Sequence, residues 1–174
     1  MAVDSEIVKD FVLESKNLIK QMLDILEDIE GDFAQVKRLG DYGNLVDRIM
    51  GGAKNIAILA DEKHASNLIS DYAALCKAVG YKASQIKDNE QFYDICVALL
   101  MDATETLNNI VDCVDFDVET VKKTVPITFI ERIRWVSSQF SKEYRESVGS
   151  GGKVEEEKQL SQTEIDDLMK KLGF

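Results

Sequence analysis

Long amphipathic segments, with apolar residues every three or four positions, constrain the fold of this chain more than any other feature. Side chains at this spacing share one face of an α-helix, at about 100° per residue. The pattern predicts four long helices, from Asp4 to Gly31, Phe33 to Leu59, Asp61 to Gly80 and Asp88 to Val114. These are expected to close a four-helix bundle. A short helix over 115–125 and, after Pro126, a further long helix should pack on its outside.

The composition points to the same fold class. The 174 residues include one proline and ten glycines, and 7% of them are aromatic. A sandwich or barrel would need many turns and many β-branched strands, so these values favour an all-α protein. The length suits one domain with a sizeable core, which we place at residues 1–145. Gly40 and Gly43 weaken the start of the second helix and can separate a short piece from it.

The net charge limits the classes of partner. A formal charge of −11 and a pI near 4.6, without a basic cluster, argue against binding to nucleic acid or to an anionic membrane. Cys76, Cys96 and Cys113 have no metal-ligand spacing and occupy apolar helical positions, which is typical of reduced core thiols. With no transmembrane run and no signal-peptide pattern, we expect a cytoplasmic protein that binds other proteins and holds no metal.

The helical stretch 45–59 contains two adjacent glycines, which a helix should avoid. Its apolar stripe predicts one buried face, and Asn44, Asp47, Gly51 and Asn55 share the opposite face. An exposed helical glycine costs about 1 kcal/mol relative to alanine, so the Gly51-Gly52 pair suggests a close approach. Either a partner protein approaches there, or a neighbouring helix of the same bundle does.

The segment Asp47-Arg48-Ile49-Met50-Gly51-Gly52-Ala53 resembles the phosphorylation-site helix of CheA-type histidine phosphotransfer domains, whose pattern is His-Ser-Ile-Lys-Gly-Gly-Ala. The acidic segment 7–29 resembles their first helix, so the likeness covers roughly the first 80 residues. It implies a bundle of the phosphotransfer type and a docking face for a response regulator. Asp47 stands in place of the phosphate-accepting histidine, and a carboxylate cannot replace an imidazole in that role. Ordinary phosphorelay at this position is therefore not expected.

The C-terminal segment 160–174 regains a helical pattern after a Gly-, Ser-, Glu- and Lys-rich stretch, 146–159, that reads as a flexible linker. Ser161 and Glu164 form a capping box, and acids precede lysines along the segment as the helix dipole favours. So short a helix is marginal alone, because isolated helices need about 12 to 15 residues or more. It should fold either on a partner or on its own bundle.

Residues 160–168, Leu-Ser-Gln-Thr-Glu-Ile-Asp-Asp-Leu, resemble the N-terminal peptide of the switch protein FliM, whose pattern is Leu-Ser-Gln-x-Glu-Ile-Asp-x-Leu. Residues 166–174 are similar to the C-terminal peptide of the chemotaxis phosphatase CheZ. Both families use these peptides to bind the phosphorylated response regulator CheY, which carries its own Mg²⁺. The resemblance implies a partner-binding set comprising Ile165, Asp166, Asp167, Leu168, Met169, Leu172 and Phe174. The rest of the chain shows no version of the catalytic helix of CheZ.

Phosphatases of the CheZ and CheC/CheX families place an acid and an amide three or four residues apart on a helix. Asn44, Asp47 and Asn55 are our catalytic candidates, with Asp41 as an additional one, because they lie on the expected docking helix. The alternative is that they are ordinary solvated polar residues. The same spacing also occurs at Glu14-Asn17, Asp88-Gln91 and Glu105-Asn108.

These features together predict a chemotaxis protein that binds phosphorylated CheY and stimulates its dephosphorylation, without a cofactor of its own. A second hypothesis is a non-catalytic adaptor or localiser that captures phosphorylated CheY and binds another chemotaxis protein through its bundle. A third, weaker hypothesis is a phosphorelay protein modified on His64, the only histidine.

Overall fold

The computed structural model describes residues 3–148 and 162–173, and these form helices joined by short turns. The elements are α1 (Ser5–Ile29), the 3-10 helix η1 (Phe33–Arg38), α2 (Leu39–Leu59), α3 (Ala65–Ala83), α4 (Glu90–Asp112), α5 (Val118–Lys122), α6 (Ile127–Val148) and α7 (Gln162–Lys171). No strand occurs in the described ranges, where a single isolated bridge joins His64 to Asp117. The predicted all-α helical fold is confirmed.

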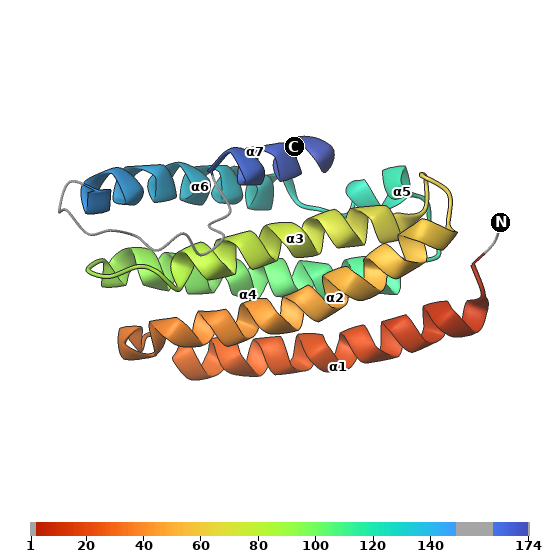
Figure 1. Cartoon of the computed structure of the whole chain (residues 1–174), viewed down its shortest axis with the longest axis horizontal. Coiled ribbons are helices and arrows are strands. Elements are labelled where there is room, and N and C mark those ends of the chain that lie inside the picture. Colours follow the sequence, from red (N-terminus) through yellow and green to blue (C-terminus); the bar gives the residue numbers. More distant parts are fainter. Residues whose placement is uncertain (1–2, 149–161, 174) are drawn as a thin grey trace.

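Helices α1 to α4 form a closed ring, in which α1 and α3 each pack against both α2 and α4. Helix α6 packs on α4, and α7 packs on α3 and α6, so these two form an added layer on the side away from α1 (Figure 1). Helix α5 lies against α3. Trp135 of α6 packs edge-on to Phe92 of α4, with the ring centroids 6.5 Å apart, and remains 49% exposed.

Within the described residues, no helix is both long enough and apolar enough to cross a membrane.

Helix starts depend on caps that the sequence predicts only in part. The Asp4 side chain accepts a hydrogen bond from the Glu6 amide, so the predicted start of α1 is confirmed. The prediction of Asp61 as the cap of the third helix is wrong, because the His64 side chain caps α3 by accepting from the Ser66 amide at 3.2 Å. Asp61 instead closes the preceding turn by accepting from the Lys63 amide. Helix α4 likewise starts one residue later than predicted, with Asn89 as its cap.

Two predicted helix ends are also wrong. Helix α3 passes through Gly80 and Tyr81 to Ala83, because Gly80 lies against the ring of Tyr42. A Cβ at Gly80 would lie 3.0 Å from that ring, so the glycine allows close packing of two helices and does not end one. Helix α6 continues to Val148, three residues into the predicted linker 146–159, whose residues 149–161 lie outside the described ranges.

Three buried tyrosines carry hydroxyl groups that the core must satisfy. The Tyr42 hydroxyl lies 2.9 Å from Thr104 Oγ1, and because Thr104 donates to the Leu100 carbonyl, Tyr42 is the donor. Tyr72 donates to the Ala103 carbonyl at 2.9 Å, and Tyr93 donates to the Ile29 carbonyl at 2.7 Å. Each bond joins two different helices, so none of these hydroxyls is buried at the cost of a lost hydrogen bond.

The buried thiol of Cys76 should make the stability of the fold decrease at alkaline pH. All three cysteines are free thiols, and burial raises the pKa of Cys76 to about 12. An unfolded thiol loses its proton near pH 8.5, so above that pH the unfolded chain binds fewer protons and the free energy of unfolding falls. At pH 10 this thiol alone should account for a loss of about 2 kcal/mol relative to pH 8. Urea denaturation at both pH values measures the loss, which should be smaller in Cys76→Ala; an equal loss in that variant would contradict the assignment to Cys76.

Candidate functional site

The exposed face of α2 carries the catalytic candidates that the sequence predicted. Asp41, Asn44, Asp47 and Asn55 are all exposed on it, and Gly51 lies between them at partial exposure. The opposite face of the same helix is buried in the core through Tyr42, Val46, Ile49, Ala53 and Ile56. The helical repeat therefore separates a polar outer face from an apolar inner one, as the sequence predicted.

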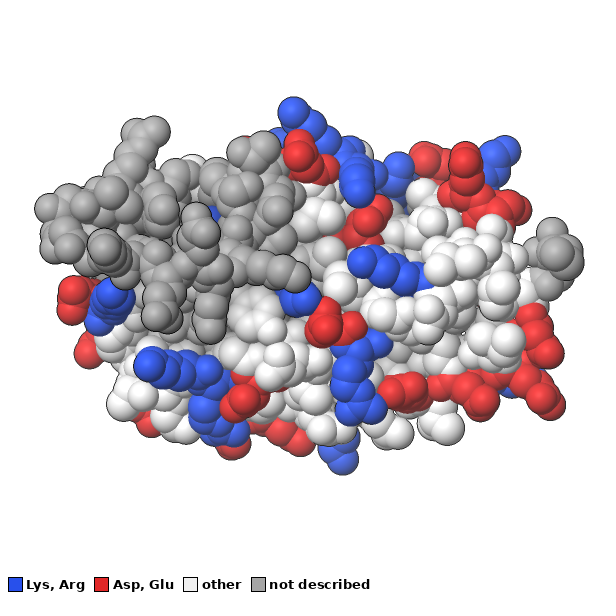
Figure 2. Space-filling model, in the orientation of Figure 1, with Lys and Arg blue, Asp and Glu red and all other residues white. Residues whose placement is uncertain are grey.

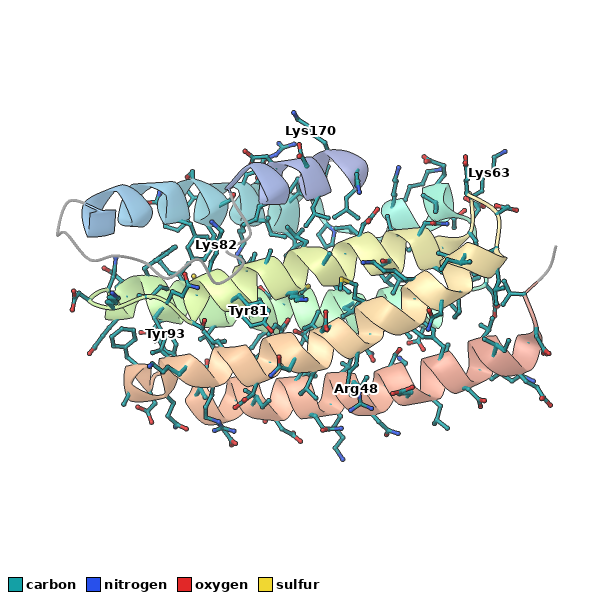
Figure 3. The ribbon with its side chains drawn as sticks, viewed as in Figure 1. Arg48, Lys63, Tyr81, Lys82, Tyr93 and Lys170 are labelled. Atoms are coloured by element: carbon teal, nitrogen blue, oxygen red, sulfur yellow. The ribbon has the colours of Figure 1, made fainter. Side chains whose placement is uncertain are left out.

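Asn44 is held in place by a residue of the neighbouring helix. Tyr81 of α3, labelled in Figure 3, donates its hydroxyl hydrogen to Asn44 Oδ1 at 2.9 Å. The Tyr81 ring lies over Gly43, where an added Cβ would come within 3.1 Å of it. The bond uses the amide oxygen of Asn44, so the two Nδ2 hydrogens can be donated to another acceptor. The tyrosine thus fixes the orientation of an exposed amide.

Asp47 is paired across the same helix boundary. Its Oδ1 lies 2.5 Å from Lys77 Nζ, which in turn lies 5.8 Å from the centroid of the Tyr81 ring. Asn44, Asp47, Lys77 and Tyr81 form what we call the α2–α3 polar cluster. Half of the Asp47 side chain is exposed, so the ion pair adds little to stability. Its effect is to set where the amide, the carboxylate and the ammonium group lie.

The two glycines of α2 differ in their surroundings. A Cβ on Gly52 would meet the Phe11 ring of α1 at 2.9 Å, whereas a Cβ on Gly51 would have nothing within 4 Å. Close packing of α1 therefore accounts for Gly52, which is the bundle-packing alternative. Packing within the described bundle does not account for Gly51, which leaves a bare patch of backbone on the exposed face of α2.

This difference predicts opposite effects of alanine at the two positions. Gly51→Ala should raise the free energy of unfolding by about 0.5 to 1 kcal/mol, because alanine favours the helix and meets no atom. Gly52→Ala should lower it by about 1 kcal/mol or more, because the buried Phe11 ring must move. Chemical denaturation of the two variants gives the comparison. Equal changes at both glycines would contradict the packing described here.

An uncharged surface continues from this face towards the end of α2. Ile58 is 80% exposed and lies two helical turns beyond Gly51, and Leu59 is also exposed. Figure 2 shows the uncharged surface on the right of the view, over the end where α2 meets α3. Exposed large apolar side chains beside polar groups are common at protein–protein contacts. Ile58 was not among the residues predicted from the sequence, although its spacing from Gly51 and Asn55 places it on the same face.

The other acid–amide pairs have different surroundings. Glu14 of α1 pairs with Arg48 of α2 at 2.9 Å, beside the candidate face. Glu105 and Asn108 of α4 line a shallow, open depression of about 410 Å³ together with Lys16 and Lys20 of α1. Lys16 is already bound to Asp112 at 2.6 Å. This depression lies between α1 and α4, on a different side of the ring from the α2–α3 polar cluster.

His64 has a structural position at the start of α3. Its Nδ1 accepts from the Ser66 amide and lies 2.9 Å from Ser66 Oγ. Because Nδ1 accepts a hydrogen bond, the neutral ring carries its proton on Nε2, which is then not a nucleophile, so the hypothesis of phosphorelay through His64 gains no support. The described residues include no group of three or more His, Cys, Asp or Glu side chains placed to hold a metal ion.

The predicted partner-binding tail lies on its own bundle. Ile165, Met169 and Leu172 are buried, Leu168 is half-buried, and Asp166 and Asp167 are exposed. Phe174 and the predicted capping residue Ser161 lie outside the described residues. The described tail thus adopts the self-docked arrangement that the sequence had left as an alternative, while its affinity for a regulator stays a prediction.

No protein-family model, no curated protein and no solved structure matches this chain. The case for a function therefore depends on the residues themselves. Lys77 and Tyr81 are the two cluster residues that sequence reasoning missed. They lie four residues apart on a helix that is otherwise mostly buried, and that spacing was the available signal.

Proposed function

We propose that this protein binds a phosphorylated CheY-type response regulator through its C-terminal helix and promotes hydrolysis of the regulator's aspartyl phosphate at the exposed face of α2. The observation that carries the proposal is the α2–α3 polar cluster. It presents an oriented amide and a carboxylate one helical turn apart on a surface that a partner can reach.

Hydrolysis of an aspartyl phosphate requires few groups from a second protein. A water molecule attacks phosphorus in line while the bond from phosphorus to the aspartyl oxygen breaks. The products are the aspartate carboxylate and inorganic phosphate, which keeps both hydrogens of the water. Positioning the water and stabilising charge supply most of the rate gain in such reactions. Asn44 Nδ2 is the group that would hold the attacking water, because Tyr81 already fixes the amide oxygen.

Asp47 would contact the active-site lysine of the regulator. Its Oδ1 is engaged with Lys77, but a carboxylate has two oxygens and can accept from two ammonium groups at once. Lys77 then keeps the carboxylate in position before the regulator arrives. Such preorganisation reduces the entropy that must be lost on binding. Asn55 and the bare backbone at Gly51 extend the contact face towards Ile58.

The direct test is phosphate release from the phosphorylated regulator with Mg²⁺ present, measured with and without this protein at substoichiometric concentration. We expect release to accelerate in proportion to the protein added, with each molecule acting many times. Unchanged release together with measurable binding would exclude the phosphatase and leave the adaptor.

The adaptor is the second candidate, and two observations favour it. The surface depression described above lies between α1 and α4 and not at the candidate face. Lys77 also neutralises Asp47, which weakens that carboxylate as a partner for another lysine. An adaptor would use the Gly51-to-Ile58 face to hold a second chemotaxis protein while the tail captures phosphorylated CheY.

Both candidates predict that the chain does not accept a phosphoryl group from a chemotaxis kinase. Asp47 replaces the imidazole that would form the phosphoramidate, and the neutral His64 ring carries its proton on Nε2 because Nδ1 caps α3. Incubation with a phosphorylated kinase should leave the protein unlabelled. Acid-labile label that disappears on substitution of His64, or alkali-labile label that disappears on substitution of Asp47, would show that the chain is a relay protein instead.

A further inference from the structure

The tail helix α7 is docked with the same face that is expected to enter the regulator. Ile165, Met169 and Leu172 are 0%, 5% and 1% exposed against the groove between α3 and α6. Side chains at such spacings anchor an amphipathic helix in an apolar groove. One face of one helix cannot fill two grooves at once, so docking on the bundle and binding to the regulator exclude each other.

The docked tail also has electrostatic and backbone contacts of its own. Asp71 of α3 is half-buried, which raises its pKa, and it interacts with Lys171 of the tail and Lys54 of α2. Gly173 ends the tail helix with φ +79° and lies beside Lys122 of α5. Three elements of the bundle, α3, α5 and α6, therefore contact the tail, so its position is specified by more than apolar burial.

We infer that the groove between α3 and α6 is an internal binding site for the tail, and that it competes with the phosphorylated regulator for the apolar face of α7. This inference depends on the proposed function, because the regulator is the competitor. The docked chain is the resting state, and the regulator must displace the tail before it can be held. The apparent affinity for the regulator equals the intrinsic affinity multiplied by the fraction of chains whose tail is undocked.

Competition from a tethered segment is effective even when the contact is weak. A segment of the same chain experiences its own bundle at an effective concentration of about 1 mM. The phosphorylated regulator must bind the tail tightly enough to overcome that competition. Docking lowers the apparent affinity of every ligand of the tail by the same factor, so a ligand that would only half-saturate the free tail loses more occupancy than one that stays well above saturation.

The test links the tail to its groove. Cysteines are introduced by Asp71→Cys and Lys171→Cys in the full chain, with Cys113→Ala because that thiol is only partly buried. A short bismaleimide then joins the two positions. We expect the linked chain to bind the phosphorylated regulator about tenfold or more weakly than the same variant left unlinked. Equal affinity of the two forms would overturn the inference.

A second variant tests the groove without a link. Asp71→Lys places a positive charge beside Lys171 and should release the tail, so regulator binding should tighten by about two- to tenfold. Asp10→Lys, the same charge reversal at an exposed site on α1, is the control and should change nothing. Unaltered affinity in Asp71→Lys, together with faster amide exchange in the tail, would count against competition.

Amide hydrogen exchange of residues 165–172, measured in the chain without regulator, distinguishes failure of this inference from failure of the proposed function. Protection there, lost in Asp71→Lys, reports docking whether or not any regulator binds. If the tail is protected and the unlinked chain binds no regulator, the proposed function is wrong and the groove remains the binding site of the tail alone. If the tail exchanges freely from the start, the groove does not hold it and the inference is wrong.

Discussion

Deletion of residues 160–174 is expected to weaken binding of the phosphorylated regulator by about tenfold or more, since apolar anchors supply most of the affinity of a helix held in a groove. The bundle should remain folded, because the ring of α1 to α4 closes without α7. Titration calorimetry of the full and shortened chains measures the difference. Unchanged affinity would show that the regulator is held elsewhere.

Single substitutions within the tail sharpen this experiment. Leu172→Ala should weaken both binding to the regulator and docking of the tail on its own bundle. Because weaker docking frees more tail for the regulator, the two losses partly cancel in the measured affinity. Leu168 is only half-buried in the docked state, so Leu168→Ala should lose regulator contact with less effect on docking. Lys170→Ala, at an exposed position, is the matched control. We therefore expect the largest drop in apparent affinity at Leu168.

Replacement of Asn44 by alanine is expected to lower turnover by about tenfold to a thousandfold while leaving regulator affinity intact, as for other groups that act on the transition state alone. Asp47→Ala and Asn55→Ala test the remaining candidates on the same face. All three side chains are exposed, so the variants should be about as stable as the parent. Single-turnover phosphate release at saturating protein separates turnover from binding.

Tyr81→Phe provides the decisive comparison for Asn44. It removes only the hydroxyl that fixes the amide, so turnover should fall in the same direction as in Asn44→Ala but by less. Asn17→Ala on α1, another amide one turn from an acid, is the control and should keep full activity. If the three candidate variants hydrolyse the phosphorylated regulator at the parent rate, the Glu105-Asn108 pair becomes the next one to test.

Sequence periodicity was enough to predict the helices because burial of one face repeats along each of them. The caps were harder, because several polar residues stand near each helix start and only the backbone path decides among them. Asp61 and His64 are both able to cap, and the turn before α3 uses Asp61 for itself. Gly80 has a typical helix-ending identity, but the Tyr42 ring packed on it shows that tertiary contact decided its role.

Only the α2 residues of the candidate site could be predicted from the sequence. Asn44 and Asp47 could be selected because they belong to one helix, where spacing fixes their relation. Lys77 and Tyr81 come from a second helix, and their distance from the first depends on how far the two helices are shifted along each other. A sequence pattern has no information about that shift. The same reason left the docking of the tail undecided.

The hydroxyl groups of the buried tyrosines prevent the helices from sliding past one another. Tyr42 of α2 and Tyr72 of α3 end on Thr104 and Ala103, adjacent residues in one turn of α4. A slip of one turn, about 5.4 Å, would break both bonds and leave their polar atoms buried without a hydrogen-bond partner. Helices α2 and α3 are thus both attached to one point on α4. The layer of α5, α6 and α7 lies outside the ring of α1 to α4, so it can move to admit a partner without breaking either bond.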